Sequence, residues 1–154
     1  MVRFLGVLSL LCIVGSTNAF GQAPSPSRAM GFHWGVVADP DDPVDAHRLG
    51  VQYVVTWFGP LEFYPAFELF LDLEPVWQAL LNVRVRPLGR DGAKSVWYVG
   101  GGAVLRSSEI RPGFLSGLEV PVRQLRPFIE LRYHWTQFID GVYELIVGVN
   151  FPLP

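Results

Sequence analysis

A run of acidic residues is the first feature of the sequence whose residue types could support chemistry. Its members are Asp39, Asp41, Asp42, Asp45 and His47. Carboxylates at this spacing are ligands that Ca²⁺ accepts. The segment lacks the ligand order of an EF-hand, however, and Pro40 and Pro43 stiffen it. We therefore expect a solvated acidic loop, and we predict neither a metal site nor a cofactor site.

Three consecutive glycines, Gly100 to Gly102, are the second such feature. A glycine run cradles phosphate when it precedes the N-terminus of a helix. Here alternating apolar residues flank the run, so it falls inside a predicted strand with no helix after it. Glycine within a strand marks a bend or a close approach. We expect the run to help the sheet curve.

Charged side chains follow a period of two along eight segments. These are residues 30–38, 51–58, 61–72, 76–86, 97–106, 114–122, 128–135 and 143–151. In a strand, alternate side chains point to opposite faces. One face of these segments carries all five tryptophans and no charged residue, while the opposite face is charged. Asp72, and Arg126 just before the seventh segment, belong to the charged face. On that polar face we predict a lumen network of Glu62, Glu68, Arg84, Arg86, Arg106, Glu119, Glu130, Arg132 and Glu144.

The length and number of these segments predict an architecture. Strands of about 9–11 residues cross a bilayer when tilted. An even number of antiparallel strands closes without an edge, and eight strands leave a lumen that side chains just fill. We therefore predict an all-β protein, an eight-stranded antiparallel up-and-down transmembrane β-barrel over residues 30–154, with a packed polar lumen and no open pore.

Composition narrows the function classes. Half of the 154 residues are apolar, 17% are charged and the net charge is −2. This balance excludes a disordered chain and gives no basic surface for nucleic acid. Lys94 is the only lysine, whereas a soluble exterior needs many charged side chains.

The N-terminus has the organisation of a secretory signal peptide. Arg3 precedes a Leu-rich uncharged run, and small residues stand at the third and first positions before a cut after Ala19. We predict residues 1–19 as the signal peptide, with a cut after Ala23 as the alternative, and residues 20–29 as a linker. Cys12 lies in the leader, so the mature chain has no cysteine for a disulfide.

Large aromatic residues fall near the ends of the predicted strands. If the N-terminus starts in the periplasm, one set lies at the periplasmic end and a second at the outer end, as aromatic girdles do. The first set is Trp57, Trp97 and Phe151, and the second is Trp77 and Trp135. Trp34 lies in the middle of its strand and does not fit a girdle.

Three phrases of the sequence resemble the small outer-membrane β-barrel family of the OmpA/OmpX type. They are SVWYVGGGAVLR, GLEVPVRQLRPFIELRYHW and the closing YELIVGVNFPLP. The resemblance covers residues 30–153 and implies a monomer in the bacterial outer membrane, in contact with its lipid. The last phrase resembles the strand through which the barrel-assembly machinery recognises such proteins. It departs from that pattern because Pro152 to Pro154 follow Phe151.

A second, local resemblance concerns His134, Thr136 and Glu144. Outer-membrane lipid A deacylases are eight-stranded barrels with a His-x-Ser pair on the penultimate strand and a later Glu. The resemblance implies a hydroxyl activated by His134, with Glu144 orienting the ring. Here Thr136 replaces the serine, Gln137 replaces the usual Asn, and the alternation points His134 inward, away from lipid.

Three functions follow in order of preference. The first is an outer-membrane barrel with a structural or surface-interaction role and no enzymatic activity. The second is a lipid A deacylase-like enzyme. The third is a soluble lipocalin-like binder of apolar ligands, in which the apolar face would point inward and the charged face outward.

Overall fold

The computed structural model describes residues 28–38, 46–58, 60–71, 76–87, 96–106, 109–135 and 141–154. The predicted signal peptide at 1–19 lies outside this range, as does most of the predicted linker at 20–29. No helix in the described part of the chain is long and apolar enough to span a bilayer.

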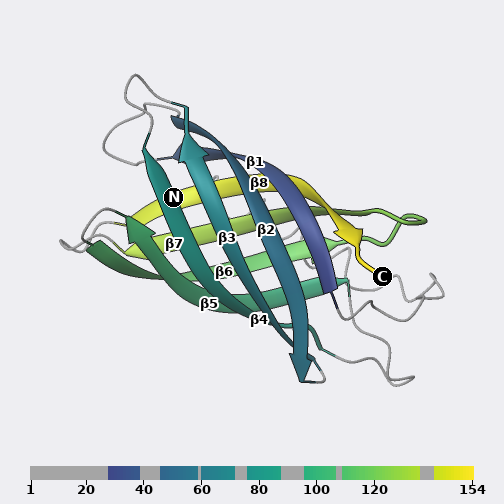
Figure 1. Cartoon of the computed structure of the whole chain (residues 1–154). Coiled ribbons are helices and arrows are strands. Elements are labelled where there is room, and N and C mark those ends of the chain that lie inside the picture. The colour runs from purple at the N-terminus through teal and green to yellow at the C-terminus, as the bar shows by residue number, and fades with distance from the viewer. Residues whose placement is uncertain are drawn as a thin grey trace, which may run out of the picture.

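Eight strands form one closed barrel in chain order (Figure 1). Their bounds are β1 Arg28–Ala38, β2 Ala46–Phe58, β3 Leu61–Phe70, β4 Trp77–Val85, β5 Trp97–Arg106, β6 Glu109–Glu119, β7 Arg126–Trp135 and β8 Gly141–Pro152. Every neighbouring pair is antiparallel, and β8 closes the barrel on β1, with Ala29 opposite Pro152 and Ala38 opposite Tyr143. The predicted fold class is confirmed.

Polar residues occupy the inside of the barrel and apolar residues the outside. On β7 the buried residues are Phe128, Glu130, Arg132 and His134, and the residues between them are more exposed. The outward wall carries large apolar side chains on every strand, such as Phe32 at 53% and Phe114 at 59% exposure. Period-two alternation in the sequence therefore becomes a difference between the lumen and the outer wall.

Six of the eight strands start at a different residue from the sequence prediction. β7 and β8 each start two residues earlier, at Arg126 and Gly141, and β4 starts one residue later, at Trp77. β1 begins at Arg28, two residues before the predicted position. β2 begins at Ala46 inside the predicted acidic loop, because Ala46 to Gly50 pair with Val37 to His33 of β1. β6 begins at Glu109 rather than residue 114, because Glu109 to Gly113 extend the ladder with β5. Charged residues in these stretches, with prolines inside or shortly before them, predict loops there.

Glycines make room for the large inward side chains. Eight of the ten strand glycines point inward, each beside a bulky residue of a neighbouring strand. A Cβ added at Gly50 would lie 2.2 Å from Nε2 of His33, and one at Gly113 would lie 2.3 Å from Nδ1 of His134. Such pairing lets eight strands enclose arginine, histidine and tyrosine side chains without widening the barrel.

Candidate functional site: the polar interior of the barrel

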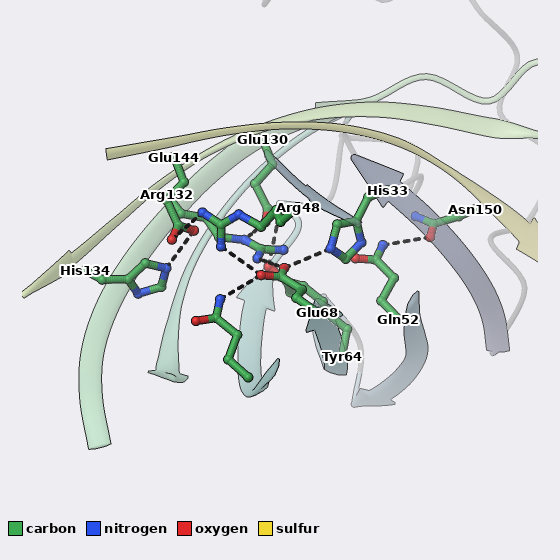
Figure 2. Close-up of polar contacts among 11 residues, drawn as sticks. His33, Arg48, Gln52, Tyr64, Glu68, Glu130, Arg132, His134, Glu144 and Asn150 are labelled. Carbon is green, nitrogen blue, oxygen red and sulfur yellow. Dashed lines mark hydrogen bonds and ion pairs between the residues drawn. The ribbon is translucent and has the colours of Figure 1, made fainter. Parts of the chain in front are cut away.

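Glu68 is the centre of the interior network (Figure 2). Its carboxylate lies 2.8 Å from Nε2 of His33 and accepts a 2.8 Å hydrogen bond from Nη1 of Arg48. It also accepts bonds from Nε2 of Gln78 at 2.7 Å and from Nη1 of Arg132 at 2.5 Å. These partners belong to β1, β2, β4 and β7, so one residue of β3 is bonded to four other strands.

Arg48 joins Glu68 to a second carboxylate. Its Nη2 forms an ion pair with Glu144 of β8, and Nε2 of His134 lies 3.0 Å from the other oxygen of Glu144. The result is a continuous chain of contacts from His33 through Glu68, Arg48 and Glu144 to His134. All five residues are buried, with at most 6% of their surface exposed.

Glu130 extends the network along the barrel. It accepts a 2.5 Å bond from Nε of Arg132 and a 2.9 Å bond from the hydroxyl of Tyr64. The guanidinium of Arg84 lies over the ring of Tyr64 at 4.9 Å and over that of Tyr98 at 4.3 Å. These cation–π contacts link the central network to a second cluster.

The second cluster lies at the end of the barrel where β1 begins and β8 ends. Arg84 donates to Glu62 at 2.8 Å and to Glu119 at 3.1 Å. Arg86 lies 3.0 Å from Glu119 and 3.4 Å from Glu62. Arg126 lies 3.6 Å from Glu119. Three guanidinium groups and two carboxylates therefore share one site, in which only Arg126 is partly exposed.

The two clusters balance their charges. Together they contain five arginines and five glutamates, namely Arg48, Arg84, Arg86, Arg126 and Arg132 with Glu62, Glu68, Glu119, Glu130 and Glu144. An isolated charge in a low-dielectric interior costs several kcal/mol, and removal of one partner exposes that cost. Each buried charge in the interior therefore depends on its partners, and loss of one group destabilises the groups paired with it.

The structure places eight of the nine predicted lumen residues in these two clusters. They are Glu62, Glu68, Arg84, Arg86, Glu119, Glu130, Arg132 and Glu144, and each is at most 4% exposed. The ninth, Arg106, lies half-buried at the end of β5, with its guanidinium 4.7 Å from the ring centre of Phe70. Asp72, on the same predicted face, lies outside the described residues.

Sequence reasoning missed several members of the network. The sequence predicts a loop at Arg48, although Arg48 is four positions from Gln52 on the same inward face. His33, Gln52 and Tyr64 lie on the polar face of the alternation. Their place on that face is the sequence feature that could have identified them as lumen residues. Gln52 donates to Asn150 at 2.8 Å, and Asn150 donates to Glu119 at 2.7 Å. These amides extend the second cluster to β2 and β8.

The aromatic residues predicted for the membrane interfaces occupy both ends of the barrel. Trp57, Trp97 and Phe151 lie at the end of β2, the start of β5 and the end of β8, which share one barrel end. Trp77 and Trp135 lie at the opposite end. All five are outward and exposed, from 37% for Trp135 to 73% for Trp57.

Trp34 and His47 make an outward contact near that opposite end. Their rings stack with centroids 5.5 Å apart. His47 was predicted within the acidic loop, but the structure places it in β2 because it pairs with Val36 of β1. The four aspartates from Asp39 to Asp45 lie outside the described residues.

The candidate catalytic residues are only partly brought together. His134 and Glu144 are in contact, but both point inward and are 6% and 4% exposed. Thr136 lies outside the described residues. The described residues contain no group of three His, Cys, Asp or Glu side chains able to hold a metal ion. Gly100 to Gly102 lie within β5, and no helix follows them in the described chain.

Comparison with known proteins identifies the fold but no family. No protein-family model matches the chain, and no curated protein sequence does. Among solved structures, the N-terminal β-barrel domain of Pseudomonas aeruginosa OprF is similar, with a TM-score of 0.60, 11% identity, and coverage of 82% of this chain and 98% of that one. Neisserial surface protein A, NspA, is similar with a TM-score of 0.59 and 10% identity, and the alignment covers 82% of this chain and 96% of that one.

A designed protein has the same fold. A de novo designed transmembrane β-barrel aligns with a TM-score of 0.62 and 12% identity, and the alignment covers 86% of this chain and 100% of that one. At these identities the likeness concerns the fold alone. The chain therefore has the fold of an eight-stranded transmembrane β-barrel, of the kind found in solved outer-membrane proteins.

Proposed function

We propose that this chain is an integral protein of the bacterial outer membrane, with a structural or surface-interaction role and a lumen too full to conduct. Two of the similar solved structures are bacterial surface or outer-membrane barrels, which supports this location. The proposal depends above all on one observation. Charged side chains lie inside the barrel and apolar side chains lie outside, the reverse of a soluble barrel.

That inversion distinguishes a membrane protein from a soluble one. Nine charged residues of the two ionic clusters are buried, while the outer wall exposes large apolar side chains such as Leu131 at 37% and Leu145 at 49%. Soluble monomers rarely expose contiguous apolar patches larger than a few hundred Å². The lipocalin-like alternative required apolar residues inside and charges outside, so the structure contradicts it.

The side-chain contacts across the interior support a non-conducting lumen. Hydrogen bonds and ion pairs connect β3 to β1, β2, β4 and β7, and connect β2 to β8. A barrel of eight strands has an interior just wide enough for side chains. A water-filled path would require these contacts to separate.

A non-enzymatic role is part of the proposal. Glu144, which would orient a catalytic His134, also forms an ion pair with Arg48 inside the barrel. A lipid substrate would contact the outer wall, whereas His134 points to the lumen. Purified protein should therefore show no deacylation of lipid A or phospholipid. Deacylation that disappears in the His134→Ala variant would instead establish the enzyme.

The proposed partners follow from the fold. The outer wall is in contact with outer-membrane lipid, and β8 is the strand offered to the barrel-assembly machinery. We expect a monomer, since the pairing of β8 with β1 leaves no free strand edge to which a second copy could add. With an overall charge of −2, it has no role in binding nucleic acid.

Membrane fractionation tests the proposed location. The protein should be found in the outer-membrane fraction and require detergent for extraction. On a gel it should migrate as a compact band when unheated and more slowly after boiling, because a closed barrel resists detergent until heated. Recovery in the soluble fraction without detergent would contradict the proposal.

A further inference from the structure

The turn between β6 and β7 has an unusual surface. Val122 and Leu125 exchange backbone hydrogen bonds of 2.8 and 3.0 Å, so Arg123 and Gln124 form the tip of a tight hairpin. Val120, Val122 and Leu125 are exposed by 39%, 51% and 43%. In Figure 1 this hairpin extends past the C-terminus on the right of the view. Exposed valine and leucine at a turn indicate a surface that something apolar covers.

Arg123 itself lies in a backbone conformation that favours glycine. Its φ is 55°, and it is the only non-glycine residue with a positive φ in the described chain. Left-handed backbone is costly for a residue with a Cβ. A side chain kept at such a position points to a use for that side chain. Here the side chain is an exposed guanidinium at the tip of an apolar hairpin.

Arg28 is a second exposed guanidinium at the same end of the barrel. It begins β1 on the outward face shared by Met30, and it lies opposite Val55 of β2. Trp57 is two residues beyond Val55 on that face, and Phe151 is on the adjacent β8. The backbone oxygen of Arg28 accepts a 3.0 Å bond from the N–H of Leu153, which fixes the strand start. Arg28 is therefore level with the aromatic girdle.

Charge distinguishes this end of the barrel from the other. The sequence connecting strands at this end contains four basic residues, Arg86, Arg90, Lys94 and Arg123, and one acidic residue, Asp91. The sequence connecting strands at the opposite end contains seven acidic residues and no Lys or Arg. They are Asp39, Asp41, Asp42, Asp45, Asp72, Glu74 and Asp140.

We propose that Arg28 and the β6–β7 hairpin tip bind the headgroups of anionic phospholipids in the leaflet at this end of the barrel. The guanidinium groups of Arg28 and Arg123 take the lipid phosphates, for which the planar fork of arginine is well matched. Val120, Val122 and Leu125 insert between the headgroups, where apolar side chains leave water. The proposal rests on the membrane location proposed above.

Tryptophan fluorescence provides local reporters for both sites. Trp57 is on β2 beside Arg28, and Trp97 pairs with Leu118 at the base of the hairpin. Trp77 is at the opposite end and serves as the reference. Three variants of the chain should each keep one of these tryptophans, with the other four changed to Phe. Each is reconstituted in phosphatidylcholine vesicles with a minor share of phosphatidylglycerol, one lipid or the other being brominated to quench fluorescence.

We expect brominated phosphatidylglycerol to quench Trp57 and Trp97 more strongly than its share of the lipid alone would give. At Trp77 we expect no such excess. Each arginine near an anionic surface contributes about a five-fold preference. Arg28→Gln should remove that factor at Trp57 and leave Trp97 unchanged, while Arg123→Gly should do the reverse. Arg111→Gln is the matched control, because Arg111 is at the opposite end and is paired with Glu109.

The outcomes separate this proposal from the membrane location itself. Equal quenching by both lipids at Trp57 and Trp97 would overturn headgroup binding while leaving the membrane location intact. Absence of quenching by either lipid at all three positions would overturn both. Added inorganic phosphate at constant ionic strength should leave the preference unchanged. If it abolishes the preference, the site binds free phosphate and the headgroup assignment is wrong.

Discussion

At the scale of single residues, the interior depends on carboxylates that each serve several strands. Glu68 contacts His33, Arg48, Gln78 and Arg132, so its charge compensates two buried guanidinium groups at once. A surface ion pair contributes little to stability, whereas a buried one is costly to break from one side. Glu68 is accordingly the carboxylate on which the central cluster depends, as Glu119 is for the second cluster.

Glu68→Gln should lower the free energy of unfolding by about 3–5 kcal/mol, because Arg48 and Arg132 lose their charged partner inside the barrel. Urea unfolding in lipid vesicles, followed by tryptophan fluorescence, measures the change. Glu109→Gln is the matched control. The Glu109–Arg111 pair is 39% and 28% exposed at its side chains, and its loss should cost less than about 1 kcal/mol. Equal effects of the two substitutions would contradict the proposed importance of Glu68.

Adding a side chain at an inward glycine should destabilise the barrel. A Cβ at Gly113 would lie 2.3 Å from Nδ1 of His134 and 2.6 Å from the backbone oxygen of Tyr133, which has little freedom to move. Gly113→Ala should therefore destabilise the barrel by about 1–3 kcal/mol, as overpacking does. Gly101→Ala is the control, since a Cβ there points outward and meets its nearest atom at 3.0 Å. The same unfolding assay compares them, and the prediction is wrong if Gly101→Ala is the more damaging change.

At the scale of elements, the β6–β7 turn carries the one strained residue in the described chain. Replacing Arg123 by glycine removes the Cβ that disfavours a φ of 55°. We expect Arg123→Gly to raise the free energy of unfolding by about 1 kcal/mol in vesicles of neutral lipid. A loss of stability there would show that the arginine side chain makes a contact that supports the fold.

The strands differ in how well the sequence alone predicted them. Alternation assigned the residues of β7 to the correct faces, because Glu130, Arg132 and His134 alternate with Ile129, Leu131 and Tyr133. It failed at the start of β2, where one inward charge, Arg48, followed four aspartates and two prolines. Local composition indicated a loop there, while pairing with β1 makes a strand.

The interior site was predictable as a set of residues but not as a set of contacts. The period-two alternation alone placed Glu68, Glu130 and Arg132 on the polar face. Nothing in the sequence indicated that Glu68 would contact His33 on β1 and Arg132 on β7, since these pairs are 35 and 64 residues apart. Such contacts depend on the closure and stagger of the whole barrel.

At the scale of the whole molecule, the proposed role requires a barrel that does not conduct ions. In planar lipid bilayers, the purified protein should produce no stepwise conductance, because side chains of β2, β3, β7 and β8 meet across the lumen. Regular conductance steps from the unmodified protein at low applied voltage would contradict the filled lumen. They would leave the membrane location unaffected.

The proposed membrane location requires that the apolar outer wall of the barrel faces lipid. The measurement introduces single cysteines at Ile129, Leu131 and Tyr133 of β7 and at Gln124 of the turn. The chain used lacks residues 1–19, so its sequence contains no other cysteine. Spin labels attached there are tested in vesicles for collisions with oxygen, which concentrates in hydrocarbon, and with a water-soluble nickel complex. We predict that oxygen dominates at the three strand positions and nickel at Gln124. If collisions with nickel dominate at Leu131, the wall faces water and the proposed membrane location is wrong.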